Sequence, residues 1–110
     1  MTEPAFLILT ALVDAPCHGY GIVAEVSELS GGRVRLKIGS LYGVLDRLVG
    51  AGLVELDREE AWRGRLRRYY RLTDRGHAAL ADEAERLAAN ARTASTRLRA
   101  RRAAIEVATS

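Results

Sequence analysis

The stretch that decides the fold is Gly39-Ser40-Leu41-Tyr42-Gly43-Val44-Leu45-Asp46-Arg47-Leu48, which predicts a short helix with two unlike faces. Ser40 is placed to act as the N-cap, because its hydroxyl can accept a hydrogen bond from a free backbone N–H of the first turn. Leu41, Leu45 and Leu48 then recur at helical spacing. They predict one buried stripe that holds the helix on its domain.

The outer face of this predicted helix is small and able to form hydrogen bonds. It carries Ser40, Gly43 and Arg47, with Tyr42 beside the buried stripe, and glycines at positions 50 and 52 close the helix. A helix in the DNA major groove needs small residues for close approach and a few donors for bases and phosphates. An ordinary amphipathic helix is the alternative, so the flanking sequence has to decide.

Positive charge is concentrated in one part of the chain. The 17 lysines and arginines exceed the 14 acidic residues by only three, but seven arginines lie between Arg58 and Arg75. Guanidinium groups neutralise phosphates and release counterions, so nucleic acid is the natural partner of such a cluster. Taken alone, the cluster also fits a solvated charged surface.

Other classes of protein find little support. The 110 residues suit one small domain, with or without an extended helix. Cys17 is the only cysteine, which fits a reducing cytoplasm and predicts no disulfide, metal site or cofactor. The apolar run from Met1 to Val13 is too short to span a bilayer and predicts a buried helix. His18 and His77 lack a recognisable catalytic partner, so we do not expect an enzyme.

Two helices and a short strand are expected before the central helix. The segment 5–13 is apolar nearly all round, as in a helix enclosed by neighbours. A second helix is predicted from about Tyr20 to Ser30, with its inner side formed by Tyr20, Val23, Val26 and Leu29. Apolar and basic residues alternate over 33–38, which predicts a short strand with a positive edge that includes Lys37.

A basic hairpin is expected after the central helix. Its strands are predicted at Leu53–Arg58 and Leu66–Leu72, with a loop too long for a two-residue turn. Both faces are basic near the tip, and burying unpaired arginines there would be costly. We therefore expect the tip to be exposed.

A long last helix is expected after Thr73, which can cap it. Apolar residues recur along it by fours and threes, which is a heptad seam: Leu80, Ala84, Leu87, Ala91, Ala94 and Leu98. We interpret the seam as a dimer interface completed by Phe6 and Leu9, although packing on the first helix of the same chain is an alternative. Beyond Arg99 the seam is interrupted by arginines, and a fraying exposed helix fits that part equally well.

The predicted order of elements is that of a winged helix-turn-helix, a mainly α (α+β) fold. We expect this DNA-binding domain at 1–73 and a dimerisation helix at 74–110. Four strings resemble the PadR family of bacterial transcriptional regulators, over about Phe6 to Leu80: His18-Gly19-Tyr20-Gly21-Ile22, Gly39-Ser40-Leu41-Tyr42 with Leu45-Asp46-Arg47-Leu48, Gly52-Leu53-Val54, and Arg68-Tyr69-Tyr70-Arg71-Leu72-Thr73-Asp74-Arg75-Gly76.

The resemblance implies a cytoplasmic homodimeric repressor that binds double-stranded DNA at a palindromic operator. It implies that the central helix lies in the major groove and that the hairpin, the wing, follows the adjacent backbone or minor groove. Ser40 and Tyr42 match family positions that contact DNA, and Tyr20 is a candidate phosphate contact. Arg47 lies at a commonly basic position, whereas Gly43 departs from the proline that is frequent in the family.

From these features we expect Ser40, Tyr42 and Arg47 to contact bases and phosphates. Backbone anchors are expected at Lys37, Arg63, Arg65, Arg67 and Arg68. Proteins similar to the PadR family often release DNA when a small-molecule inducer binds, but this sequence identifies no ligand. Trp62 could stack on an aromatic compound, cover the hairpin or face DNA.

Two alternatives remain at this level. A winged helix can also serve as a protein-binding module, against which the dense arginines of the hairpin argue. Cys17 could sense oxidants, but a turn cysteine without a basic neighbour other than His18 is more often inert.

Overall fold

The computed structural model describes residues 1–109, so Ser110, the last residue of the predicted dimerisation helix, lies outside the described residues. The elements run in the order α1 (Glu3–Ala11), β1 (Cys17–His18), α2 (Gly19–Leu29), α3 (Ile38–Gly50), β2 (Val54–Trp62), β3 (Arg65–Leu72) and α4 (Asp74–Thr109). The described residues thus form four helices and one three-stranded antiparallel sheet. This mainly helical winged helix-turn-helix confirms the predicted fold class.

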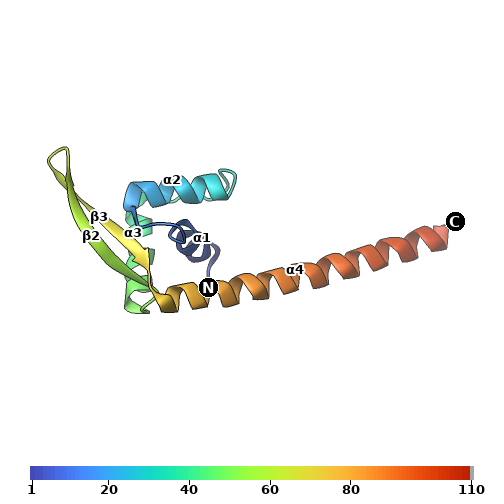
Figure 1. Ribbon diagram of the computed structural model, residues 1–110. Helices are drawn as coiled ribbons and strands as arrows, with labels where there is room; N and C mark the ends of the chain where they lie inside the picture. The colour runs from blue at the N-terminus through green and yellow to red at the C-terminus, as the bar shows by residue number, and fades with distance from the viewer. Residues whose placement is uncertain (110) are drawn as a thin grey trace. The chain divides into compact units, whose positions relative to one another are not determined.

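The chain divides into two compact units, Met1–Leu80 and the rest of α4 from Ala81. The first unit extends past the predicted boundary at residue 73 because the first turns of α4 bury Gly76 and Leu80. Its three other helices lie beside one end of the β2–β3 hairpin, while the turn of the hairpin points away from them (Figure 1). The predicted division of labour between the two segments remains a prediction.

The core of the first unit joins the three short helices to the base of the hairpin. Leu41, Leu45 and Leu48 of α3 are buried, which confirms the predicted inner stripe. They pack in one cluster with Ile22 of α2 and Val54 of β2. Burying a leucine side chain of this kind is worth roughly 1.5–3 kcal/mol, so these three residues fix α3 firmly against its neighbours.

Leu9 is an exception to the predicted dimer interface. It has no exposed surface within the first unit, because it lies in the core with Ile8 and Leu12. Leu80 is also nearly buried within that unit. Leu9 therefore has no surface to offer to a second copy, and its assignment to the interface was wrong.

Two predictions for the residues before and at the start of α3 were also wrong. Residues 33–38 form no strand, because the third place in the sheet is taken by β1, which pairs with Tyr69 and Tyr70 of β3. Ser40 is not the N-cap, because α3 begins two residues earlier, with the carbonyl of Lys37 accepting from the Leu41 N–H at 2.9 Å.

The inner face of α2 also differs from the prediction. The helix spans nearly the expected residues, but its buried positions are Gly19, Ile22 and Val26, whereas Tyr20 and Leu29 are exposed. Only Val26 belongs to both sets. Because the helix approaches α3 through Gly19, the buried stripe is rotated away from the larger Tyr20.

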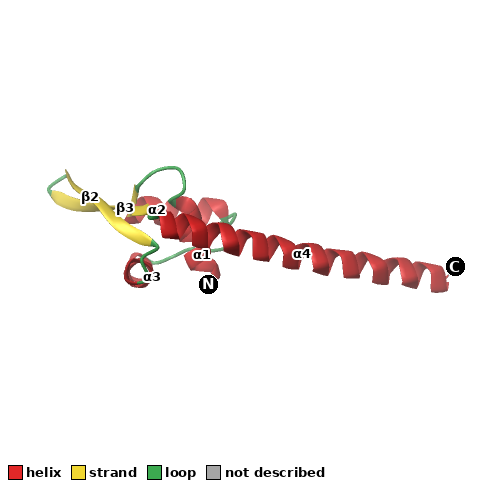
Figure 2. Ribbon diagram, turned by 60° about the horizontal axis from the view of Figure 1, so that its bottom comes forward, coloured by secondary structure: helices red, strands yellow, loops and turns green. Residues whose placement is uncertain are grey.

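The hairpin is longer and more tightly closed than expected. β2 and β3 pair from Val54–Leu72 to Trp62–Arg65, which leaves a two-residue turn in place of the predicted long loop (Figure 2). Arg63 and Gly64 have φ of 49° and 76°, the left-handed conformation that two-residue hairpin turns require. This closure carries the strand pairing out to the tip of the wing.

The start of α4 confirms the predicted cap. The Thr73 hydroxyl accepts from the Gly76 N–H at 2.9 Å and donates to the Gly52 carbonyl at 2.6 Å. Thr73 therefore joins the end of the wing to the segment after α3. From there α4 continues as a helix to Thr109, including the part beyond Arg99.

Candidate nucleic-acid interface

The outer face of α3 is open, as its sequence predicted. Ser40 and Arg47 are exposed, and no heavy atom would lie within 4 Å of a Cβ built on Gly39 or Gly43. Because the helix carries no bulky side chain at these places, another molecule can approach its backbone closely. Arg47 has no ion-pair partner among the described residues, so its guanidinium is available to such a molecule.

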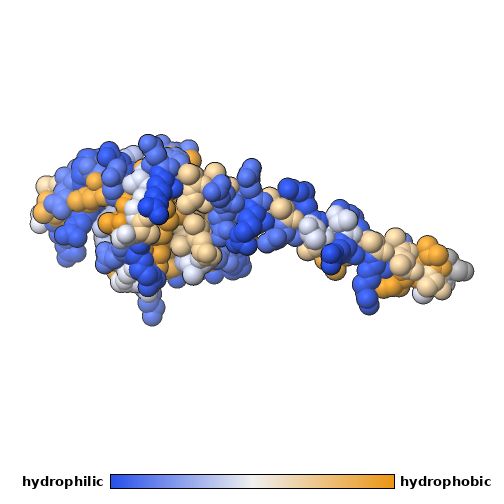
Figure 3. All heavy atoms as spheres, turned by 90° about the horizontal axis from the view of Figure 1, so that it is seen from below, coloured by the Kyte–Doolittle hydropathy of each residue, from blue (hydrophilic) through white to orange (hydrophobic). Residues whose placement is uncertain are grey.

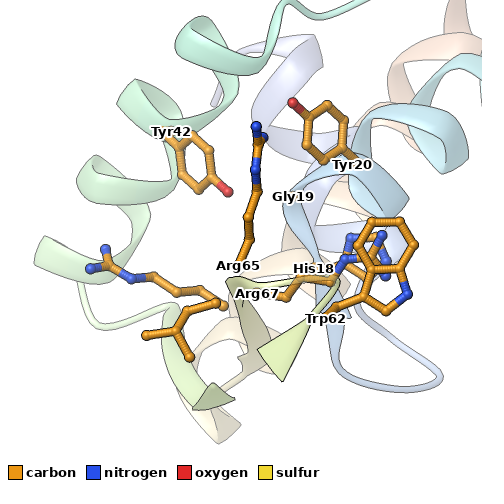
Figure 4. Close-up of a pocket in the computed structure, with 9 residues that line it drawn as sticks. His18, Gly19, Tyr20, Tyr42, Trp62, Arg65 and Arg67 are labelled. Atoms are coloured by element: carbon orange, nitrogen blue, oxygen red, sulfur yellow. The ribbon is translucent and has the colours of Figure 1, made fainter. Parts of the chain in front are cut away.

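Tyr42 is positioned by a close contact between α2 and α3. A Cβ built on Gly19 would lie 2.6 Å from the Tyr42 hydroxyl oxygen and 3.3 Å from Cδ1 of Ile38. Any larger residue at position 19 would have to displace the Tyr42 ring, so glycine allows this approach as it stands. Tyr42 is therefore half-buried, with its hydroxyl directed toward the beginning of α2 rather than along the outer face of α3 (Figure 4).

A concavity of about 110 Å³ lies between α3, the beginning of α2 and the wing. Figure 4 shows side chains from all three elements around it. Aromatic and cationic residues dominate its lining, which includes Tyr20, Tyr42, Trp62, Arg65, Arg67 and Arg68. Five residues predicted as DNA contacts are thus brought to one place, although they come from segments far apart in the chain.

The arginines of the wing fall into two groups. Near its base, Arg71 pairs with Glu55 at 2.8 Å and with Asp57 at 3.2 Å, and Arg58 pairs with Asp57 and with Glu60, each at 2.7 Å. Arg58 also lowers the pKa of the Glu60 carboxyl, so that this acid stays ionised. The arginines at the base are therefore largely neutralised by the protein itself.

Toward the tip, Arg63, Arg65 and Arg67 lack such partners among the described residues. Arg67 places its guanidinium 3.6 Å from the centre of the Trp62 ring, and Arg63 lies 4.5 Å from the same centre. Contact with an aromatic face orients a guanidinium without neutralising it. Arg65 has no ion pair among the described residues, whereas Arg68 has a long one of 3.4 Å to Glu59. Unneutralised positive charge is thus concentrated at the tip.

Trp62 and His18 are the site residues whose roles sequence reasoning missed. Trp62 was noticed but given no single role, and its pairing with two arginines depends on the unforeseen two-residue turn. His18 caps α2, with Nδ1 accepting from the Gly21 N–H at 3.2 Å, and its ring meets Tyr69 edge to face at 5.3 Å. Histidine is not among the preferred N-caps, so only the break between Pro16 and Gly19 hinted at this position.

The cap makes the stability of the domain depend on pH. Burial, reinforced by the charge of Arg67, lowers the pKa of His18, and the accepting Nδ1 has to be unprotonated. Between the pKa of His18 in the folded protein and its pKa in the unfolded chain, the unfolded chain binds more protons. The contribution of His18 to stability is therefore fully present above about pH 6.5 and is lost as the pH decreases below it. When the pH is lowered from 7.5 to 5.5, we expect the denaturation midpoint of the protein to fall. It should fall less in His18→Asn, which keeps a capping side chain. An equal fall in both proteins would exclude His18 as the cause.

Burial also raises the pKa of the Cys17 thiol. A thiol that stays protonated at neutral pH reacts slowly with oxidants, so the structure gives no support to a redox sensor at this position. Within residues 1–109 no group of three or more histidine, cysteine or acidic side chains could hold a metal ion, and no helix there has the length and apolar character needed to cross a bilayer.

Comparison with known proteins decides the family. Residues 8–82 match the model of the transcriptional regulator PadR-like family. This chain belongs to that family. The match covers the whole helix-turn-helix and wing, together with the first turns of α4.

Two relatives match most of this chain. A 37.1 kDa protein encoded in a transposon of Streptomyces fradiae is 44% identical over 86 residues, which are 78% of this chain and 23% of that relative. A protein of Lysinibacillus sphaericus is 30% identical over 76 residues, covering 69% of this chain and 70% of the relative. This chain thus spans less than a quarter of the length of the first relative.

Two solved structures are similar to this PadR-like chain in fold. A PadR family transcription regulator from Clostridium difficile superposes with a TM-score of 0.76 at 25% identity, covering 88% of this chain and 99% of that one. Bacillus subtilis PadR, solved in complex with operator DNA, superposes with a TM-score of 0.66 at 26% identity, covering 74% of this chain and 46% of that one.

Proposed function

We propose that this protein is a sequence-specific DNA-binding repressor that acts as a homodimer on a palindromic operator. The observation that carries the proposal is the unneutralised positive charge at the wing tip beside the open outer face of α3. Base edges are reached by a helix with a small outer face, and phosphates are held by unpaired cations around it. The operator complex of Bacillus subtilis PadR supports this use of the fold.

Within this proposal each surface has its own role. Ser40 and Arg47 contact bases or phosphates from the open face of α3. Tyr42 and Tyr20 donate their hydroxyls to phosphates at the concavity, and Lys37 does the same with its ammonium at the start of α3. Phosphates along the wing are held by Arg63, Arg65, Arg67 and Arg68. The proposal includes repression, and release of DNA when a small molecule binds, because both are expected of a PadR-like protein. No ligand site is assigned.

Selection of DNA from a random pool with the purified protein tests the proposal directly. We expect the enriched sequences to share a two-fold symmetric site, because a symmetric dimer presents two identical α3 helices. A mixture without a common sequence would refute sequence-specific binding. It would favour the alternative use of the winged helix, a module that binds protein.

The dimer is tested by changing the exposed seam of α4. Leu87 is 42% exposed in the protomer and lies midway along that seam. We expect Leu87→Glu to convert the dimer into monomers in analytical ultracentrifugation at micromolar concentration, because a carboxylate would be buried in the interface. Phe6 and the alanines at 84, 91 and 94 complete the proposed surface. A dimer that persists in the variant would place the interface elsewhere.

A further inference from the structure

A second concentration of positive charge lies in α4. The wing, residues 54–72, contains six arginines and four carboxylates, whereas residues 91–102 of α4 contain five arginines and no carboxylate. Without those five arginines, the acidic residues of the chain would outnumber the basic ones by two. Hydrophilic side chains stand out from the middle of α4 in Figure 3, and apolar ones lie nearer its end. The net positive charge of the protein therefore depends on a segment outside the winged helix.

This basic stretch is not neutralised by its own helix. Earlier in α4, Arg86 pairs with Glu83 one turn away at 2.6 Å. The arginines of the basic stretch are all exposed and have no ion pair among the described residues: Arg92, Arg97, Arg99, Arg101 and Arg102. Arg97 lies four residues from Arg101, a spacing at which like charges repel and destabilise a helix. A partner that carries negative charge would remove this repulsion.

Two of these arginines share one face of α4 with two threonines. Arg92, Thr93, Thr96 and Arg97 line a shallow depression together with Ala89. At 3.6 residues per turn, these positions lie on the side of the helix opposite the heptad seam. A second copy of the chain on the seam therefore leaves this face accessible. We call the four polar side chains the basic surface of α4.

The chemistry of the basic surface fits a phosphate backbone. Arg99 donates to the Thr96 hydroxyl oxygen at 3.4 Å, and the hydroxyl hydrogen has no acceptor among the described residues. The small side chains between the arginines allow close approach, and both residue types commonly hold the phosphates of DNA. A helix bound to a membrane would bury its apolar face in lipid, but in this chain that face is the seam assigned to the second copy.

We propose that the basic surface of α4 binds the phosphate backbone of double-stranded DNA, whatever its sequence. Arg92 and Arg97 are about 7.5 Å apart along the helix axis, and one DNA strand presents a phosphate about every 3.4 Å of its axis. Each arginine can therefore contact a phosphate of its own. The inference goes beyond the proposed function, because this surface lies outside the winged helix and needs no operator. It adds affinity for any DNA, while α3 and the wing select the site.

Paired variants test whether the basic surface contacts DNA. In titrations of a random duplex, Arg92→Ala/Arg97→Ala should lower the slope of log K against log salt concentration by roughly two units, because each phosphate contact contributes about 0.9. Arg101→Ala/Arg102→Ala is the matched control, since these two arginines line a different depression with Leu98, on the seam side. It should change the slope by well under one unit. Equal losses in the two variants, at the same oligomeric state, would show a general effect of net charge and overturn the inference.

Photo-cross-linking measures the contact without relying on affinity. In a Cys17→Ser background, Thr96→Cys and Asp82→Cys are each labelled with a benzophenone maleimide and irradiated with the same random duplex. Both positions lie on the same side of α4, but Asp82 belongs to residues 81–90, which contain three carboxylates and one arginine. We expect roughly fivefold more cross-linked DNA from Thr96→Cys, because positive potential concentrates DNA at that end. Equal or lower yields would place the DNA elsewhere.

A lipid surface is the competing partner, and it is tested with phosphatidylserine vesicles. If Arg92→Ala/Arg97→Ala keeps its salt slope on DNA but loses binding to these vesicles, the basic surface serves a membrane and the inference is wrong.

The preference for selected over random DNA separates this inference from the proposed function. Arg92→Ala/Arg97→Ala should keep that preference within about twofold of the unaltered protein, because phosphate contacts carry no sequence information. If the unaltered protein selects no sequence but the slope and cross-linking results hold, the proposed function fails and this inference stands. If it selects a sequence and the two paired variants behave alike, only this inference fails.

Discussion

Gly76→Ala is expected to destabilise the domain by about 3 kcal/mol or more, the upper range for forcing an extra group into a packed site. A Cβ on Gly76 would lie 2.0 Å from the carbonyl oxygen of Leu53, which is backbone and cannot move aside cheaply. That oxygen also accepts from the Thr73 N–H at 3.1 Å. The added methyl group therefore has to separate the start of α4 from the segment after α3 and disturb the Thr73 cap.

Urea denaturation at one protein concentration measures the effect, since dimerisation would otherwise shift the midpoint. Gly43→Ala is the matched control, because it adds the same methyl group to another helix where nothing lies within 4 Å. It should leave stability unchanged or raise it by about 0.4–1 kcal/mol. If Gly76→Ala and Gly43→Ala unfold at the same urea concentration, the close approach at Leu53 does not exist.

The parts of the fold that the sequence predicted are those governed by local periodicity. The buried stripe at Leu41, Leu45 and Leu48 is visible in the spacing of the leucines. Thr73 is recognisable as an N-cap because threonine is a preferred capping residue and stands directly before the last helix. The order of the four helices and the hairpin also followed from the pattern. Each of these features depends on residues within one or two turns of each other.

The failures have non-local causes. Residues 33–38 alternate as a strand does, but a strand also needs a neighbour, and Cys17–His18 takes the open edge of β3. The tight turn at Arg63–Gly64 was missed because residues 59–65, most of them charged, were predicted as a loop. In the structure residues 59–62 pair with residues 65–68, and Glu59 forms an ion pair with Arg68 across the two strands. Tyr20 fitted the buried helix period, but the contact of Gly19 with Tyr42 rotates α2 and exposes it.

The candidate site shows the same limit. Its cationic members could be selected from the sequence, since exposed arginines in a hairpin are readily recognised. The sequence could not show which of them are neutralised, because Arg71 and Arg67 lie on the same strand and differ only in which side chains contact their guanidinium groups. Glu55 and Asp57 pair with the first, and Trp62 stacks on the second.

That difference leads to the prediction with the largest effect on DNA binding. The double variant Arg65→Ala/Arg67→Ala should weaken binding to operator and random DNA alike. Each phosphate contact contributes about 0.9 to the slope of log K against log salt concentration, so the slope should fall by roughly two units. Arg71→Ala removes an arginine from the same strand that is already paired with two carboxylates, and we expect the slope to change by well under one unit.

Arg47→Ala separates reading of sequence from neutralisation of phosphates. If Arg47 contacts a base edge, its loss should reduce the preference for operator over random DNA by about 1–3 kcal/mol. Titrations of fluorescent operator and scrambled duplexes at several salt concentrations measure both quantities for all three variants. If Arg71→Ala reduces the slope of log K against log salt concentration by as much as each arginine of the Arg65/Arg67 pair does, the ion pairs at the base of the wing open in the complex. Equal losses on operator and scrambled DNA in Arg47→Ala would assign Arg47 to a phosphate, and specificity would then have to come from Ser40, Tyr42 or the backbone exposed at Gly39 and Gly43.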